Sequence, residues 1–322
     1  MADKIKIKHI MEKPLVSIVI LNYKRFDELQ ETIQRSKDIT YQNIEIIIVD
    51  NGSNDRSTEY IKSLSDNEYV KILLSHNGGT AFGRTQGQKA AKGELIIHLD
   101  DDAYLNPYVV EKTVAIFNKN PKLAAIGYGL VNPLTIAMTD EKYWSNQAID
   151  IKKGQFDNSY HFPISPSGAA FRRSALVEVG YFDLSWNWTT RTEDNELNLK
   201  LIAHGYNTVI LDDLIAYHKA APSHRVSEIL TINSIHGILW VILKFYPPLY
   251  IIKKVFYLLF LCVYFTIMNK NTTYLKAIIR SMKKAFLMLE NNVRITKKMA
   301  KRIDLREILL FSMGDDVQWG GS

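Results

Sequence analysis

Two short segments near the start of the chain, Val16–Leu21 and Ile46–Val49, consist almost entirely of apolar residues. Strands buried on both faces have this composition, whereas a strand with one wet face alternates apolar and polar residues. Up to about residue 130 the chain repeats an apolar strand pattern, a turn rich in Gly or Asn, and a helical pattern. Such alternation is typical of parallel strands joined by crossover helices. The sequence therefore predicts an α/β fold with a mostly parallel central sheet.

The predicted elements follow from these patterns. In the first part of the chain they are the strands Val16–Leu21, Ile44–Asp50, Val70–Leu74, Leu95–Leu99 and Leu123–Tyr128 and the helices Phe26–Ser36, Ser57–Leu64, Ala81–Ala91 and Pro107–Asn118. Residues 132–166 have poor periodicity and many aromatic side chains, which is typical of a functional loop or lid. Later elements are helices near Ser174–Val179 and over Glu193–His204 and a short strand over Thr208–Leu211.

A chain of 322 residues is long enough for one large domain with an appendage. We expect an N-terminal extension over 1–14, a main α/β domain over 15–225 that divides at about residue 130, and a C-terminal helical region over 226–322. The single cysteine, Cys262, excludes an intrachain disulfide, and no signal peptide is visible. Both features fit a reducing, cytoplasmic compartment.

Three successive carboxylates, Asp100, Asp101 and Asp102, follow the predicted strand Leu95–Leu99. Because side chains alternate along a strand, Asp100 and Asp102 face the same way if the strand geometry continues. Hard oxygen ligands suit Mg²⁺ or Mn²⁺, which usually bind one or two carboxylates together with substrate phosphates. For a D-x-D sequence alone, a solvated turn or a helix N-terminus is the alternative. The triplet predicts a divalent-cation site that receives a phosphorylated donor.

Other polar residues stand at the same ends of predicted strands, where α/β sheets bind ligands. Asn22 follows the first strand and Asp50 ends the second. A carboxylate at Asp50 can accept the imide N–H of uracil or thymine, although D-N-G-S is also ordinary turn chemistry. The glycine loop around Gly79 enters a helix, so its backbone N–H groups and the Arg84 side chain can meet a diphosphate.

A second carboxylate pair, Glu193 and Asp194, opens a predicted helix. One interpretation is helix capping and dipole complementation, worth about 0.3–1 kcal/mol per charge. The other is a general base, Asp194, that removes a proton from an acceptor hydroxyl. His218 follows the short strand and is a candidate third metal or phosphate contact, with a hydrogen-bonded or surface histidine as the alternative.

Taken in order, these residues resemble the pattern of glycosyltransferase family 2, which has the GT-A nucleotide-sugar fold. The shared motifs run from the opening Val16–Tyr23 through V-D-N-G-S, D-x-D and the block Arg172–Asp183 to Glu193-Asp194. The resemblance implies inverting, metal-dependent sugar transfer in a single in-line displacement. Asn51, where many members have a second Asp, is similar to the rhamnosyltransferase-like branch and leaves UDP- and dTDP-sugars open as donors.

The resemblance implies that 15–225 is a catalytic domain, with a donor half over about 15–130 and an acceptor half over about 131–225. It also implies a role for each candidate residue. Asp50 contacts the nucleobase, Asp194 is the catalytic base with Glu193 beside it, and the metal ligands are Asp100, Asp102 and His218. The remaining assignments are Asn22, Gly79, Arg84, Asp100 and Asp101 to the donor and Trp144, Ser167, Gly168 and Trp188 to the acceptor side. The acceptor is a hydroxyl of a cell-surface glycan or lipid-linked precursor. A sugar-1-phosphate nucleotidylyltransferase and an inactive membrane-bound sugar-nucleotide-binding scaffold stay open as alternatives.

The C-terminal region carries most of the positive charge, with 14 Lys and Arg against 5 Asp and Glu from Lys244 onward. The uncharged run Val255–Met268 spans about 21 Å as a helix, less than a roughly 30 Å hydrocarbon core. From Leu275 to Leu289, apolar residues at helical spacing alternate with Lys and Arg. This pattern predicts a basic amphipathic helix in the plane of an anionic leaflet.

We therefore expect a cytoplasmic protein that is peripheral to the inner face of the cell membrane. A transmembrane span over 249–268 stays open, because Lys253 and Lys254 near its start can extend toward the interface. A helical cap on the catalytic domain and a homodimer interface are the other uses of this region. We expect no nucleic-acid partner.

Overall fold

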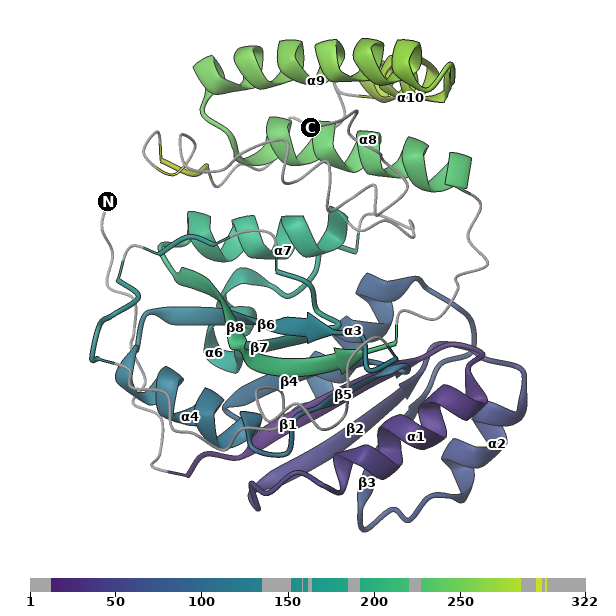
Figure 1. The fold of residues 1–322 in the computed structure, drawn as a ribbon, viewed down its shortest axis with the longest axis vertical. Helices are drawn as coiled ribbons and strands as arrows, with labels where there is room; N and C mark the ends of the chain where they lie inside the picture. The colour runs from purple at the N-terminus through teal and green to yellow at the C-terminus, as the bar shows by residue number, and fades with distance from the viewer. Residues whose placement is uncertain are drawn as a thin grey trace. The chain divides into compact units, whose positions relative to one another are not determined.

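The computed structural model describes residues 13–134, 152–157, 159–161, 164–184, 192–219, 227–284, 294–296 and 299. The chain forms two compact units (Figure 1). The first, here called the sheet unit, comprises Met1–Leu184 and Tyr206–Pro222. The second, the helical unit, comprises Ser185–Gly205 and Ser223–Ser322.

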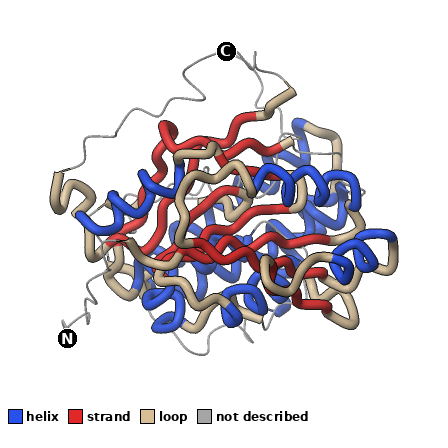
Figure 2. Tube along the Cα trace, turned by 90° about the horizontal axis from the view of Figure 1, so that it is seen from below, coloured by secondary structure: helices blue, strands red, loops and turns tan. Residues whose placement is uncertain are grey.

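The sheet unit contains one eight-stranded sheet in the order β3-β2-β1-β4-β7-β6-β8-β5. Figure 2 shows the strands side by side. Their bounds are β1 (Val16–Asn22), β2 (Ile44–Asp50), β3 (Tyr69–Leu73), β4 (Leu95–Asp100), β5 (Ala103–Leu105), β6 (Leu123–Val131), β7 (Gly168–Arg172) and β8 (Asn207–His218). The first four are mutually parallel, as is the pair β6 and β8, whereas β7 and β5 run antiparallel to their neighbours. The predicted α/β fold with a mostly parallel sheet is confirmed.

Five described helices belong to the sheet unit: α1 (Phe26–Ser36), α2 (Arg56–Ser63), α3 (Thr80–Ala90), α4 (Val109–Lys119) and α6 (Arg173–Val179). These helices and the strands β1, β2, β3, β4 and β6 agree with the predicted elements to within a few residues, whereas β5 and β7 are not among the predicted strands. Every residue of β1 is buried, as its apolar composition requires.

The predicted strand Thr208–Leu211 is too short, because β8 has 12 residues and ends at His218. Asp212 and Asp213 interrupt its apolar pattern and are exposed. The β6–β8 register shifts there, after the pair Tyr128–Leu211. A bulge therefore lets one strand continue where the sequence pattern indicates a turn.

Helix α3 packs against the sheet through two positions that have no side chain, Gly83 and Gly87. A Cβ atom at Gly83 would lie 2.5 Å from Leu21 Cδ1, and one at Gly87 would lie 2.3 Å from Val19 Cγ1. Real Cβ contacts are longer, so both positions require glycine at this helix–sheet distance. Arg84, next to Gly83, is thereby held near the carboxyl end of the sheet.

The helical unit contains α7 (Thr192–Ala203), α8 (Ser227–Phe245), α9 (Pro248–Met268) and α10 (Thr273–Lys284). Gly237 of α8 lies against Thr192, since a Cβ there would be 2.5 Å from Thr192 Oγ1. The buried carboxylate of Glu196 accepts from Lys244 Nζ at 2.9 Å and pairs with Lys200 Nζ at 3.3 Å. A glycine contact and a charged pair thus join α7 to α8.

Candidate active site

The carboxyl ends of three neighbouring parallel strands bring polar side chains to one edge of the sheet. β1 lies between β2 and β4, with Asn22 opposite Asp50 and Leu21 opposite Asp100. Ligands in open α/β sheets bind outside this end of the strands. The residues assigned from sequence to the nucleotide and to the metal therefore stand on neighbouring strands, at the same edge of the sheet.

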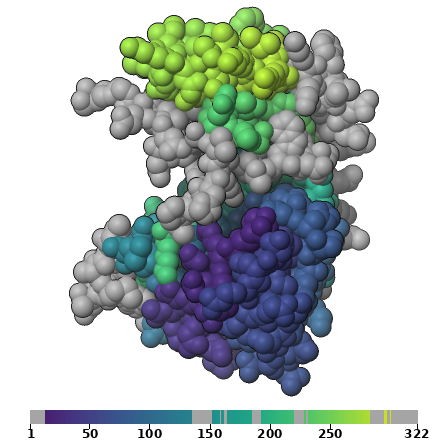
Figure 3. Space-filling model, turned by 90° about the vertical axis from the view of Figure 1, so that its right-hand side faces the viewer, coloured from purple at the N-terminus to yellow at the C-terminus, as the bar shows by residue number. Residues whose placement is uncertain are grey.

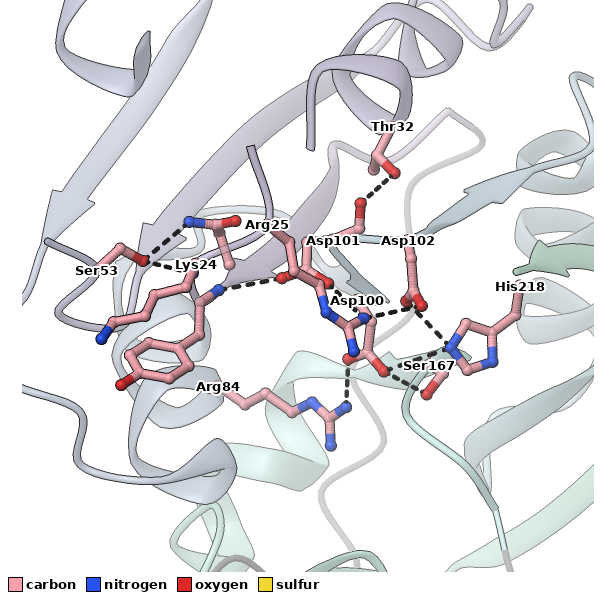
Figure 4. Close-up of polar contacts among 12 residues, drawn as sticks. Lys24, Arg25, Thr32, Ser53, Arg84, Asp100, Asp101, Asp102, Ser167 and His218 are labelled. Atoms are coloured by element: carbon pink, nitrogen blue, oxygen red, sulfur yellow. Dashed lines mark hydrogen bonds and ion pairs between the residues drawn. The ribbon is translucent and has the colours of Figure 1, made fainter. Parts of the chain in front are cut away.

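Asp100, Asp102 and His218 form a cluster whose ligand atoms all lie within 4.8 Å of one another (Figure 4). His218 Nε2 is 3.1 Å from Asp102 Oδ1 and 4.0 Å from Asp100 Oδ2. Antiparallel pairing of β5 with β8 sets Ala103 opposite His218 and so brings the histidine beside the acids. Asp101 turns the other way and accepts from the Tyr23 backbone N–H at 3.1 Å. The alternation expected of a strand thus holds, although Asp101 and Asp102 lie in a turn.

Both oxygens of Asp100 accept charge-stabilising hydrogen bonds. Arg84 Nη2 donates to Oδ1 at 2.6 Å, and the Ser167 hydroxyl donates to Oδ2 at 2.6 Å. Burial alone would raise the pKa of Asp100, but Arg84, His218 and Ser167 together hold it well below its usual range. Asp100 is therefore ionised at neutral pH. Ser167, assigned to the acceptor side from sequence, is a neighbour of this carboxylate.

Arg25, which sequence reasoning missed, joins the other two acids. Its Nη1 atom lies 3.2 Å from Asp101 Oδ1 and 2.9 Å from Asp102 Oδ2. Burial raises the pKa of Asp101 to about 7, against the opposing effects of Arg25 and the Tyr23 N–H. Arg25 stands just before α1, 76 residues before Asp101. No spacing rule connects two such positions, so only the parallel sheet reveals the contact.

The pKa of His218 is raised in this site. Burial would lower it, but the hydrogen bond to Asp102 and the charges of Asp100 and Asp102 favour the imidazolium. An imidazole must lose this proton to bind a metal through Nε2. Cation binding to the cluster is therefore expected to release a proton.

Asp50 is buried, with 1% of its surface exposed, and its carboxylate organises the turn that follows β2. It accepts from Asn22 Nδ2 at 3.3 Å, from the Ser53 backbone N–H at 3.2 Å and from the Thr58 hydroxyl at 2.7 Å. A carboxylate has about four acceptor positions, and these contacts use three of them. Its contact with the nucleobase stays a prediction, beside this structural role.

Asn51 connects the same turn to the glycine loop. Its Nδ2 donates to Asn77 Oδ1 at 3.0 Å and to the Gly79 carbonyl at 3.1 Å, and its Oδ1 accepts from the Gly78 N–H at 3.3 Å. Gly79 has a φ of +86° and precedes α3, a conformation that favours glycine. The amide of Asn51 donates and accepts at once, which a carboxylate in its place would not do. Asn51 thus shapes the loop at the α3 N-terminus.

The other candidate residues have separate surroundings. Gly168 opens β7, where a Cβ atom would lie 2.8 Å from both Ala216 Cβ and Leu130 Cδ2, so packing alone requires glycine there. Glu193 and Asp194 lie in the first turn of α7, in the helical unit. Trp144 and Trp188 lie outside the described residues. The base and acceptor assignments stay predictions.

Comparison with known proteins agrees with the fold and the motifs. The family profile described as Glycosyl transferase family 2 matches residues 17–180. A glucosyl-dolichyl phosphate glucuronosyltransferase of Haloferax volcanii is 27% identical over 180 residues, which cover 52% of this chain and 56% of that protein. A poly-beta-1,6-N-acetyl-D-glucosamine synthase of Staphylococcus aureus is 28% identical over 199 residues, covering 59% and 46%. The chain spans about half the length of these curated relatives.

Two solved structures share the architecture. The mannosyltransferase PcManGT of Pyrobaculum calidifontis, in complex with GDP-Man and Mn²⁺, aligns with a TM-score of 0.53 at 15% identity over 71% of this chain and 63% of that one. S. aureus TarS 1-349 in complex with UDP aligns with a TM-score of 0.52 at 17% identity over 71% and 65%. At these identities the likeness concerns the fold, which is GT-A-like. With the family profile covering half of its residues, from β1 to the end of α6, this chain belongs to glycosyltransferase family 2.

Proposed function

We propose that the chain is an inverting, metal-dependent enzyme that transfers a sugar from a UDP- or dTDP-sugar to a hydroxyl of a cell-surface glycan or lipid-linked precursor. The observation that carries this proposal is the cluster of Asp100, Asp102 and His218 at the carboxyl end of the sheet, where Arg84 of α3 pairs with Asp100. Family membership supports the class of reaction. Two relatives, a glucosyl-dolichyl phosphate glucuronosyltransferase and a poly-beta-1,6-N-acetyl-D-glucosamine synthase, support this class of acceptor.

The donor atoms of the cluster fit Mn²⁺ or Mg²⁺. Two carboxylate oxygens and one imidazole nitrogen form a mixed set that suits Mn²⁺ better than Mg²⁺, which prefers oxygen and water. PcManGT contains Mn²⁺ in its solved complex. When bound, such a cation offsets negative charge on the departing diphosphate. Arg84 and Ser167 would hold Asp100 in place for it, and backbone N–H groups at the start of α3 are the proposed contacts to a diphosphate.

In the proposed reaction Asp194 is the general base. An acceptor hydroxyl oxygen forms a bond to the anomeric carbon while the bond from that carbon to the diphosphate oxygen breaks, and the hydroxyl proton passes to the Asp194 carboxylate. Asp194 and Glu193 stand in the first turn of α7, where the helix dipole favours the ionised form that a base needs. Trp144 and Trp188 remain proposed acceptor contacts.

Product identity tests this function. Purified protein with Mn²⁺ is screened by thermal shift for nucleotide-sugar donors and is then assayed with lipid-linked acceptors. We expect release of a nucleoside diphosphate and inversion at the anomeric carbon. Pyrophosphate release would indicate the nucleotidylyltransferase instead, and donor binding without turnover across a broad acceptor panel would indicate the inactive scaffold.

We further propose that the helical unit binds the anionic cytoplasmic leaflet of the membrane. The outer face of α9, here called the α9 stripe, is exposed and apolar at intervals of three or four residues. Its members are Leu249, Ile252, Phe256, Phe260, Val263 and Ile267, each between 46% and 68% exposed. On α10, Leu275, Ile279 and Met282 are also exposed. Figure 3 shows atoms of these helices, in yellow-green, at the surface.

Charge favours an anionic lipid surface over other partners for this face. No Asp or Glu occurs from residue 229 to 289, whereas the same stretch has eight Lys and Arg. Lys276 and Arg280 are exposed on α10, next to the apolar residues above. Each basic residue near an anionic surface contributes about 1 kcal/mol, and apolar contact adds to it. A second copy of the chain would bring like charges together.

By length and composition α9 is able to cross a membrane. Its inner face, however, is buried through Leu258, Leu261, Cys262 and Phe265. The ring centroids of Phe265 and of Tyr274 on α10 lie 5.6 Å apart. A transmembrane α9 would draw the charged α10 into lipid or lose this contact, and either is costly. We therefore propose that α9 lies flat, with its stripe in the interface.

A further inference from the structure

Arg25 adds a second guanidinium to the site that we propose binds a divalent cation. Its Nη1 atom contacts Asp102 Oδ2 at 2.9 Å, whereas the other oxygen, Asp102 Oδ1, faces His218 at 3.1 Å. Arg84 has the same relation to Asp100, because it donates to Oδ1 while Oδ2 faces His218 at 4.0 Å. In Figure 4, Arg84 from α3 and Arg25 from the residue before α1 both point to the cluster. Each arginine therefore holds the carboxylate oxygen that points away from the histidine.

This arrangement orients the ligand atoms but reduces their charge. Three carboxylates, Asp100, Asp101 and Asp102, are accompanied by two guanidiniums, so the acids and arginines together carry a net charge of −1 when all three acids are ionised and of zero when Asp101, with its pKa of about 7, is protonated. A divalent cation attracted to Asp102 is also repelled by the guanidinium on the same carboxylate. The diphosphate of a nucleotide adds negative charge and offsets this repulsion.

We propose that Arg25 weakens divalent-cation binding to the nucleotide-free protein, so that the cation and the diphosphate of the donor bind together. The inference rests on the proposed metal-dependent function. A unit charge about 5 Å from a divalent ion in a water-like dielectric changes its affinity by roughly tenfold, and more where water is excluded. Arg84 does not substitute for Arg25, because Arg84 contacts the carboxylate of Asp100.

Manganese binding to the full-length chain tests this inference directly. Free Mn²⁺ is measured by electron paramagnetic resonance during titrations with and without UDP or dTDP, on wild-type protein and on Arg25→Met. In the wild type we expect the nucleotide to raise Mn²⁺ affinity by tenfold or more. In Arg25→Met we expect Mn²⁺ affinity without nucleotide to rise about tenfold, and the effect of the nucleotide to shrink by the same factor. By reciprocity, the effect of Mn²⁺ on nucleotide affinity shrinks equally.

Two further variants separate charge from structure. Lys62→Met removes an exposed positive charge of α2 that is paired with Glu59 at 2.7 Å, and it is expected to behave as the wild type. Arg25→Lys keeps the charge and is expected to restore weak binding without nucleotide. If Arg25→Met does not fold, as judged by circular dichroism, Arg25→Gln takes its place because it keeps a hydrogen-bond donor near Asp102.

The outcomes distinguish the inference from the function beneath it. Unchanged or weaker Mn²⁺ binding in the nucleotide-free Arg25 variant would overturn the inference, because Arg25 would then only position Asp102. Absence of Mn²⁺ binding to wild-type protein with either nucleotide would overturn the metal-dependent function itself. Wild-type binding that is equally tight with and without nucleotide would contradict the inference alone.

Discussion

The sheet edge and the α9 stripe depart from ordinary burial in opposite directions. At the sheet edge, charged groups such as Asp102 are buried and are paired with one another. On α9, large apolar side chains such as Phe256 and Phe260 are exposed. Buried charge and a large exposed apolar patch are the two departures that most often indicate function. The comparison teaches that the first region is built to receive a small charged ligand and the second to receive an extended apolar surface.

The largest effect is expected from removing a charge from the cluster at the sheet edge. Asp102→Asn keeps the shape of the side chain but removes a charge and a strong ligand for the cation. We expect kcat/KM for sugar transfer to fall by roughly 10³-fold, together with loss of Mn²⁺ binding measured by paramagnetic resonance. Asp66→Asn, on an exposed carboxylate of the sheet unit paired with Lys71, is the matched control. Wild-type transfer by the Asp102 variant would remove Asp102 from the mechanism.

The second-largest effect is expected from placing charges in the exposed apolar stripe of α9. Phe256→Asp combined with Phe260→Asp places two charges in the α9 stripe without touching its buried face. Burial of one such side chain is worth about 1.5–3 kcal/mol, so we expect affinity for anionic vesicles to fall by roughly 10²-fold or more in flotation assays. Val177→Asp, at an apolar position of the sheet unit that is 51% exposed, is the control. The alternative is that a second copy of the chain covers the α9 stripe. Light scattering without lipid tests it, because a wild-type dimer that dissociates in the double variant would assign the stripe to a dimer interface.

A smaller change sharpens the account of Asp100. Ser167→Ala removes the hydroxyl that donates to Asp100 Oδ2 at 2.6 Å. Hydrogen bonds to charged groups contribute about 1.5–3 kcal/mol, so we expect at least a tenfold fall in kcat/KM. Because the hydroxyl stabilises the ionised carboxylate, its loss raises the pKa of Asp100, but Arg84 and His218 still favour the ionised form, so we expect the fall in kcat/KM to be independent of pH near neutrality. A rise in KM for the acceptor with unchanged kcat would return Ser167 to the acceptor side.

The sheet edge was largely predictable because the physical signals are local. Continuous apolar runs predict the buried strands, and Asp100 and Asp102 follow one of them directly. Arg25 was not predictable, since its partners become neighbours only after β1 and β4 pair. For Asp50 the sequence indicates both a turn role and a nucleobase contact but does not decide between them, because turn chemistry and ligand contact require the same residue types there.

The α9 stripe was hidden for a different reason. Almost every position from Val255 to Met268 is apolar, so periodicity does not distinguish an inner from an outer face. The distinction comes from tertiary packing, since α8 and α10 cover Leu258 and Phe265 but not Phe256 or Phe260. A uniformly apolar helix therefore predicts contact with something apolar without indicating which face meets it.

The smallest predicted effect separates charge from apolar contact on the helical unit. Lys276→Gln removes one exposed charge of α10, and we expect vesicle affinity to fall about fivefold, equivalent to roughly 1 kcal/mol, in low salt. Lys62→Gln in the sheet unit, an exposed lysine paired with Glu59, should have no effect. Because salt screens surface charge, the difference between Lys276→Gln and wild type should disappear in about 1 M salt, where the Debye length is near 3 Å. Binding that persists in such salt measures the α9 stripe alone, and loss of all binding there would show that charge, rather than apolar contact, attaches this unit to the leaflet.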